Sequence, residues 1–340
     1  MENNKILVTG AAGFIGYHLC KHIVQLGKQV IGLDNLNDYY DITLKRDRLH
    51  QLGIENKLDI SYNKLYTAKE ESRFQFIQLD ISDRENLPSL FESHKINLVV
   101  NLAAQAGVRY SIDAPFSYVD SNLVGFSNVL ECCRNYKVEK LVYASSSSVY
   151  GDDPDLPFDE QSKKIKPKSF YAVTKRANEL MAQCYSDLYD IETIGLRFFT
   201  VYGPWGRPDM APILFANAIL ENQVIKVFNQ GNLSRDFTFI DDIVNGIIST
   251  FSAVTKTKHT LLNIGCGSPV NLLDFITLME EALGKKAKKE LVEMQAGDVY
   301  KTWADISQLN DVTGYTPKVN LKKGIVEFIN WYLSYKKNTV

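Results

Sequence analysis

The first part of the chain constrains the fold more than any other. A short apolar segment, 5–9, is followed by three glycines, a helical repeat of apolar residues, and a second apolar segment that ends at Asp34. The glycines are Gly10, Gly13 and Gly16. This order predicts a dinucleotide-binding βαβ unit, with the phosphates bound by free N–H groups at the helix start. Asp34 favours NAD over NADP, because a carboxylate accepts from the adenosine ribose hydroxyls and repels a 2′-phosphate.

Strand-like and helical segments then alternate, which predicts an α/β fold with an open, mostly parallel, doubly wound sheet of the Rossmann type. The expected strands are 74–79, 98–102, 140–144 and 193–198, and the expected helices are 39–52, 85–94, 116–136 and one that begins near Ser169. After about residue 203 the segments become shorter and mixed. We therefore expect a dinucleotide-binding domain at 1–203, with a polar insertion of unknown role at 41–72, and a smaller mixed α/β lobe at 204–340.

Charge and composition exclude several classes of protein. Lys and Arg total 38 against 40 for Asp and Glu, and no basic run stands out, so we expect no nucleic-acid partner. No apolar run approaches the roughly 18 residues of a membrane span, so no membrane association is expected. The five cysteines include no Cys-x-x-Cys pair and no signal peptide precedes the first strand, which favours the cytoplasm. His18 and His22 have helical ligand spacing but no third ligand nearby, so no metal site is expected.

Tyr171 and Lys175 lie four residues apart on the helix predicted after Ser169, and therefore on one face. An ammonium beside a phenol favours the phenolate, and a free phenol, with a pKa of about 10, is otherwise a weak base at neutral pH. Alone, such a pair is usually a packed ring and a solvated amine. Beside a dinucleotide site it indicates hydride transfer at a carbinol carbon, with Tyr171 handling the proton. The run 145–148, four serines, offers a hydroxyl that could relay this proton.

Six motifs follow one another in an order that carries a family resemblance. They are Gly10–Gly16, Asn101–Gln105, Ala144–Gly151, Tyr171–Lys175, Arg197–Pro204 and Arg235–Asp242. Together they resemble the extended short-chain dehydrogenase/reductase superfamily, in its nucleotide-sugar epimerase branch. Within that branch, Asp34–Tyr40 and Gln105–Ser111 are most similar to the UDP-glucuronate 4-epimerases.

The resemblance implies a mechanism with tightly bound NAD. Hydride would move from sugar C4 to the nicotinamide while Tyr171, assisted by Ser146, removes the 4-hydroxyl proton. The 4-keto sugar would then turn over before hydride returns to its other face. Lys175 would hold the nicotinamide ribose, and Asp80 and Ile81 would contact adenine. The implied cofactor residues are Gly10, Gly13, Phe14, Ile15, Gly16, Asp34, Asn35, Asp80, Ile81, Leu102, Ala103, Ala104, Asn122, Tyr171 and Lys175.

The resemblance also implies a UDP-sugar site. Its residues would be Ser146, Ser147, Ser148, Thr200, Arg207, Val227, Phe228, Arg235 and Asp298. Arg207 and Arg235 would meet the diphosphate. The 4,6-dehydratases carry Asp and Glu where Ser147 and Ser148 stand, and decarboxylases carry Glu at the latter, so neither reaction is favoured. Galactose-type epimerases carry Asn at Thr200, whereas the three hydroxyls here would suit a sugar carboxylate.

Three alternatives remain open from the sequence. Galactose-type epimerases have a phosphate-binding arginine at Gln295 and a bulky tyrosine at Thr302, and this chain departs from both. Another UDP-hexose or a UDP-N-acetylhexosamine is therefore an alternative substrate, and a non-catalytic dinucleotide sensor is an alternative of a different class. Arg109 could line the cofactor cleft or pair with an acid.

The long helices from Phe116 and Ser169 could pack against a second copy as the family's four-helix-bundle homodimer.

Overall fold

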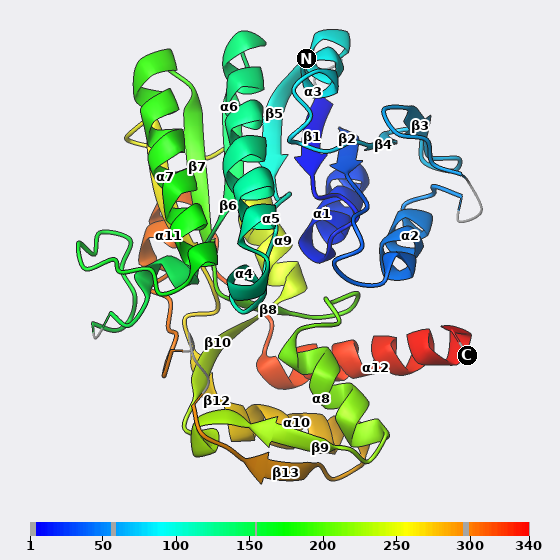
Figure 1. Ribbon diagram of the computed structural model, residues 1–340, viewed down its shortest axis with the longest axis vertical. Helices are drawn as coiled ribbons and strands as arrows, with labels where there is room; N and C mark the ends of the chain where they lie inside the picture. The colour runs from blue at the N-terminus through cyan, green and yellow to red at the C-terminus, as the bar shows by residue number, and fades with distance from the viewer. Residues whose placement is uncertain (1–4, 56–58, 154, 295–298, 340) are drawn as a thin grey trace.

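Eight strands form the central sheet of the computed structural model, which describes residues 5–55, 59–153, 155–294 and 299–339 (Figure 1). The strand order is β11-β7-β6-β5-β1-β2-β4-β3. In that order the strands span His259–Ile264, Glu192–Phe198, Lys140–Ser146, Ile96–Asn101, Lys5–Thr9, Gln29–Asp34, Phe74–Gln78 and Leu65–Thr67. All neighbours pair in parallel except β3, which is antiparallel to β4. The predicted α/β fold with a doubly wound parallel sheet is confirmed.

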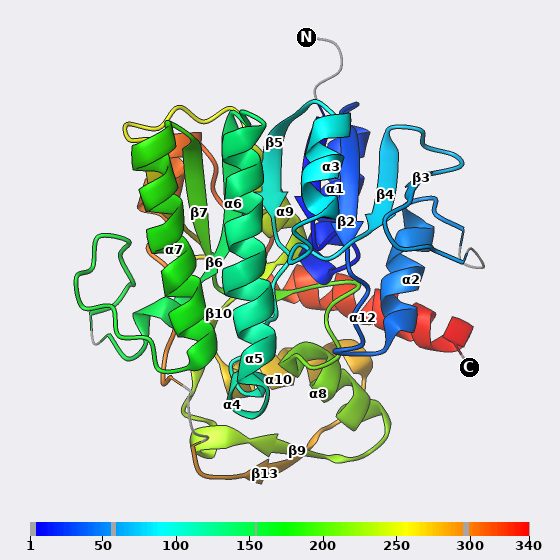
Figure 2. The same cartoon turned by 45° about the horizontal axis from the view of Figure 1, so that its top comes forward.

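Helices cover both faces of this sheet because successive strand side chains point to opposite sides. On β1, Ile6 and Val8 pack into one buried cluster and Leu7 into the other. The helices α3, α6 and α7 cover the Leu7 side, and α1 and α9 lie behind the sheet in Figure 2. These helices span Asn86–Ser93, Phe126–Asn135, Phe170–Tyr189, Phe14–Gln25 and Ile240–Ser249.

Local capping explains where two predicted helices begin. The hydroxyl of Ser169 accepts from Ala172 N at 3.1 Å, so α7 begins directly after it. Asp41 Oδ1 accepts from Thr43 N at 2.9 Å, so α2 spans Ile42–Gln51 and is shorter than the predicted 39–52. In place of the predicted helix 116–136 the structure has three consecutive segments: α5 (Pro115–Tyr118), the π-helical η1 (Val119–Gly125) and α6. A short helix that was not predicted, α4 (Tyr110–Asp113), precedes them.

A smaller lobe lies beyond the carboxyl ends of the central strands, at the bottom of Figure 1. Its sheets are β12-β10-β8 and β13-β9, with α8, α10 and α12 packed around them. These elements span Pro269–Asn271, Ser234–Phe239, Thr200–Tyr202, Lys288–Leu291, Val224–Val227, Ala211–Leu220, Leu272–Leu283 and Leu321–Thr339. The division at 203/204 stays a prediction, since β11 pairs with β7 and β8 pairs with β10 across it. Within the described ranges, no helix is both long and apolar enough to span a bilayer.

Candidate active site

The glycine-rich turn between β1 and α1 forms a site that suits a pyrophosphate. Gly10 has a φ of +71°, and a Cβ there would lie 2.9 Å from Ala103 N. A Cβ on Gly16 would collide with Gly10 O, so α1 can approach the turn closely only because this position is glycine. Gly13 precedes α1 and places no side chain over its N-terminus. The first N–H groups of α1 are therefore available to phosphate oxygens, as dinucleotide binding requires.

Asp34, at the end of β2, is buried and fixed by the backbone. Its Oδ2 accepts from Ala12 N at 3.1 Å, and its Oδ1 accepts from Leu36 N at 2.9 Å. The ammonium of Lys45, on α2, lies 4.0 Å from Oδ1 and donates to the side chain of Asn37 at 2.6 Å. Burial lowers the pKa of Lys45, while the charge of Asp34 opposes that change. The carboxylate faces the cleft with a buried cation beside it.

A single cavity brings together most of the predicted cofactor residues. Those that line it are Gly10, Gly13, Phe14, Ile15, Gly16, Asp34, Asn35, Asp80, Ile81, Leu102, Ala103, Ala104, Tyr171 and Lys175. Asn35 Nδ2 donates to Asp80 Oδ2 at 2.8 Å, which ties the ends of β2 and β4 together. The residues of the proposed adenosine end and of the proposed reaction centre thus share one cleft.

Asn122 lies behind this cleft instead of lining it. Its Oδ1 accepts from Gln105 N at 2.8 Å, and its Nδ2 donates to Gln105 O and Thr174 Oγ1, both at 3.0 Å. The side chain therefore fixes the segment after β5, which lines the cavity, to α7. In this arrangement Asn122 supports the cofactor wall, and the structure gives it no place in the cavity lining.

Tyr171 and Ser146 line both of two adjoining cavities, and Lys175 lines the first of them beside Tyr171. Lys175 Nζ donates to Ala144 O at 2.8 Å and lies 6.0 Å from the centroid of the Tyr171 ring. Burial lowers the pKa of Lys175 to about 8. Burial also raises the pKa of Tyr171, while hydrogen bonding with Ser146 and the positive charge of Arg207 oppose that rise. Two cations therefore lie near Tyr171: Lys175, as the helical spacing predicts, and Arg207, which the sequence analysis placed only at the diphosphate.

Arg207 lines both cavities and is held on one side by an acid. Its Nε and Nη2 donate to the two carboxylate oxygens of Asp209 at 3.0 and 2.5 Å. Tyr39 Oη donates to the same carboxylate at 3.1 Å, and the Arg207 guanidinium lies over the Tyr39 ring. This cluster joins the loop after β2 to the loop after β8. It sets a cation at the border between the two cavities.

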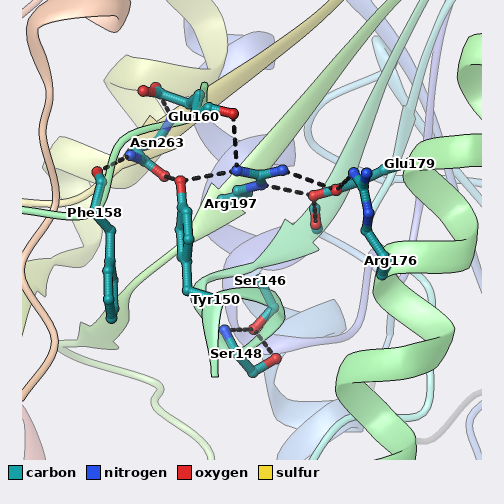
Figure 3. Close-up of polar contacts among 10 residues, drawn as sticks. Ser146, Ser148, Tyr150, Phe158, Glu160, Arg176, Glu179, Arg197 and Asn263 are labelled. Atoms are coloured by element: carbon teal, nitrogen blue, oxygen red, sulfur yellow. Dashed lines mark hydrogen bonds and ion pairs between the residues drawn. The ribbon is translucent and has the colours of Figure 1, made fainter. Parts of the chain in front are cut away.

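The second cavity gathers most of the predicted sugar-site residues. Its polar lining includes Ser146, Ser147, Ser148, Lys168, Thr200, Arg207, Arg235 and Thr302. Ser146 Oγ accepts from Ser148 N at 3.2 Å and from Ser148 Oγ at 2.8 Å, as Figure 3 shows. Val227 and Phe228 line neither cavity, and the Phe228 ring instead packs under the guanidinium of Arg109. Asp298 lies outside the described residues.

A buried ionic network fixes both ends of the serine segment (Figure 3). Arg197 donates to the two carboxylate oxygens of Glu179 at 2.8 and 3.0 Å, and Ser145 donates to the same carboxylate at 2.6 Å. On its other side Arg197 donates to Tyr150 Oη at 2.9 Å, and Tyr150 donates to Asn263 Oδ1 at 2.7 Å. Because Glu179 belongs to the same helix as Tyr171 and Lys175, the network fixes the serine segment relative to that pair.

Among the cavity residues that the sequence analysis missed are two lysines. Lys45 lies in the insertion 41–72, whose polar composition indicated a surface excursion. The spacing of Leu44 and Leu49 marks the buried face of α2 and was the available signal, since Lys45 lies on that face. Lys168, in the sugar-side cavity, forms an ion pair with Asp152. No local pattern distinguishes it from the other lysines of its segment.

Comparisons with known proteins agree with this geometry. The model of the NAD dependent epimerase/dehydratase family matches residues 6–265. The UDP-glucuronate 4-epimerase 4 of Arabidopsis thaliana is 43% identical, over 97% of this chain and 75% of its own length. The UDP-glucuronate 4-epimerase of Thermodesulfobacterium geofontis is 41% identical, over 96% and 95%. The crystal structure of UDP-glucuronic acid 4-epimerase from Bacillus cereus, in complex with UDP-glucuronic acid and NAD, superposes with a TM-score of 0.87 at 34% identity, over 97% and 99%. The resemblance seen in the sequence is thereby confirmed, and this chain belongs to the NAD dependent epimerase/dehydratase family.

Proposed function

We propose that the protein is an NAD-dependent 4-epimerase that interconverts UDP-glucuronate and UDP-galacturonate through a 4-keto intermediate. The observation that carries this proposal is the junction of the two cavities. The dinucleotide-type cleft and the hydroxyl-rich cavity share Tyr171, Ser146 and Arg207. The two relatives named above are UDP-glucuronate 4-epimerases, and each matches this chain over almost its whole length.

The cofactor side of the site fits NAD by its donor set. The N-terminus of α1 and the glycine turn would hold the pyrophosphate, and Asp34 would accept from the adenosine ribose. Lys175 would hold the nicotinamide ribose. Bound NAD supplies a reversible hydride acceptor, and the protein supplies position and proton handling.

The proton chemistry falls to Tyr171 and Ser146. Tyr171 would accept the 4-hydroxyl proton at its phenolate oxygen, directly or through Ser146, as C4 of the sugar is oxidised. Tyr171 would return the proton to the sugar oxygen when C4 is reduced on its opposite face, so the sugar would neither gain nor lose electrons overall. Burial works against the phenolate, and the nearby guanidinium of Arg207 works for it.

The sugar-side cavity supplies anchors for a diphosphate and for a carboxylate. Arg207 and Arg235 are the arginines of its lining, and guanidinium groups bind phosphate oxygens in a fork geometry. Ser147, Ser148 and Thr200 offer hydroxyl donors to the sugar carboxylate. Hydrogen bonds that hold the carboxylate in place would disfavour decarboxylation of the 4-keto intermediate.

One observation keeps a second substrate class in view. Thr302, at the position where galactose-type epimerases carry a bulky tyrosine, lines the sugar-side cavity with a small side chain. This leaves room for a 2-acetamido group on a UDP-hexosamine. A non-catalytic sensor is not favoured, because Tyr171, Lys175 and Ser146 are all present and all reach the cleft.

Incubating the purified protein with a panel of UDP-sugars and identifying the products by NMR tests the proposal. We expect UDP-galacturonate from UDP-glucuronate, without added cofactor. Tyr171→Phe should abolish turnover while NAD remains bound, since the ring stays and only the acid–base group is lost. Near-normal turnover in that variant would remove Tyr171 from the mechanism, and a product formed only from UDP-N-acetylhexosamines would favour the second class.

We further propose a homodimer built on α5, η1, α6 and α7, which contact one another; α6 and α7 lie side by side on one face in Figures 1 and 2. Large apolar side chains are exposed there: Phe116, Val173, Leu180 and Leu188. Two such helices from each copy would bury this surface as a four-helix bundle. Light scattering should give twice the chain mass, and Leu180→Glu should shift it to the monomer. A wild-type monomer at micromolar concentration would contradict the proposal.

A further inference from the structure

The loop that leads to Arg207 is bound by a single buried guanidinium. Arg48, on α2, donates from Nε and Nη2 to Trp205 O at 3.1 and 2.7 Å. The same Nη2 donates to Gly206 O at 3.2 Å. Two consecutive carbonyls are thus fixed immediately before Arg207, the cation that borders both cavities.

The other side of this guanidinium binds the glycine-rich turn. Arg48 Nη1 donates to Ala12 O at 2.9 Å and to Tyr40 Oη at 2.6 Å. The side chain has no solvent exposure, and a buried charge is tolerated only when its hydrogen bonds are satisfied. Arginine's rigid, planar fork lets one residue bind two separate segments at once. Arg48 therefore joins the phosphate-binding turn of one cavity to the arginine-bearing loop of the other.

Neighbouring groups hold the same loop in an unusual conformation. Pro204 O accepts from His18 Nε2 at 2.9 Å, and burial lowers the pKa of His18 to about 3, so the imidazole is neutral and Nε2 carries the proton. Trp205 has a φ of +61°, which non-glycine residues rarely adopt. Its ring packs between Tyr17 of α1 and Trp331 of α12. A strained backbone persists only where its surroundings over-determine it.

We propose that Arg48 is a positioning residue that sets the place of Arg207 relative to the glycine turn. It thereby fixes the separation between the diphosphate of the nucleotide sugar and the pyrophosphate of the dinucleotide. The inference rests on the proposed function in one respect, that Arg207 binds the substrate diphosphate. It also gives a role to the insertion 41–72, because α2 carries Arg48 into the site.

A double-mutant cycle on UDP binding tests this inference. The dissociation constant of UDP is measured by calorimetry for the wild type, Arg48→Met, Arg207→Met and the double variant, each with its bound NAD quantified. We expect Arg48→Met to weaken UDP binding about 10-fold, as losing the orientation of one charged contact would. In the Arg207→Met background the same change should have little further effect, because the residue that Arg48 positions is already absent.

Two further variants separate positioning from general loosening. Tyr335→Phe removes the 2.7 Å hydrogen bond from α12 to Asp47 of α2 but keeps the ring that packs against Trp205 of the loop, and should leave UDP affinity unchanged. Arg48→Lys replaces Arg48→Met if the latter fails to fold. It keeps the positive charge but cannot bind both segments at once, so it too should weaken UDP binding.

Each outcome bears on the inference. Equal losses in both backgrounds, an unchanged affinity in Arg207→Met, or a matching loss in Tyr335→Phe would overturn it. Product formation from UDP-sugars is measured separately. An inactive protein with a non-additive cycle would therefore refute the proposed function and leave the positioning role of Arg48 standing.

Discussion

Glu160 provides a quantitative test of the buried architecture behind the site. Its side chain is buried, and its Oε1 accepts from the backbone N–H of Asn263 on β11 at 2.5 Å. Burial raises the pKa of Glu160 from 4.5 to about 7, against the opposing effects of that hydrogen bond and of the charge on Arg197. A difference of this size corresponds to about 3 kcal/mol between the two protonation states.

The sign of the effect follows from proton binding. Between about pH 4.5 and pH 7 the folded protein keeps the Glu160 proton that the unfolded chain releases. Stability from this group is therefore fully present below pH 4.5 and is lost as the pH rises to about 7. Glu160→Gln keeps an oxygen for the Asn263 N–H and cannot ionise, so the variant should escape this loss of about 3 kcal/mol.

The assay compares melting temperatures of the two proteins at pH 5 and pH 8. For 340 residues, the usual unfolding entropy converts about 3 kcal/mol into about 4 °C. The wild type should therefore lose about 4 °C more than Glu160→Gln between the two pH values. Glu92→Gln, at an exposed glutamate of α3, is the matched control and should follow the wild type. Equal losses in wild type and Glu160→Gln would refute the reasoning, because Glu160 would then titrate alike in both states.

Two further predictions concern the hydroxyl-rich cavity and the network beneath it. Thr200→Val should reduce kcat/KM for UDP-glucuronate more than for UDP-glucose, because it removes one hydrogen-bond donor to the sugar carboxylate. Steady-state kinetics measure both values, and equal losses would contradict the proposed carboxylate site. Glu179→Gln should lower the free energy of unfolding by about 3 kcal/mol or more, because Arg197 would be left as an uncompensated buried charge. Urea denaturation measures this loss, and a loss under about 1 kcal/mol, as for a surface pair, would show that the network is dispensable.

The sequence predicted those parts of the protein whose structure depends on local pattern. The strand, glycine turn and acid at the N-terminus, and the start of α7 at Ser169, each follow from neighbouring residues, and the structure has them where expected. Lys45 and Arg48 were not predicted, because charged residues in a polar insertion ordinarily face solvent. Their burial depends on carbonyls and a carboxylate supplied by distant segments, which no local pattern records.

The same limit explains how the charges around Tyr171 are arranged. Helical spacing correctly places Lys175 on the face of Tyr171, but its ammonium is directed to Ala144 O. Arg207, a residue distant in sequence and the expected diphosphate ligand, also acts to lower the pKa of that phenol, against the effect of burial. Asp209 holds the Arg207 guanidinium with its own negative charge, and Arg48 and His18 bind the loop that carries it, so this cation reaches Tyr171 through long-range contacts that no local pattern records.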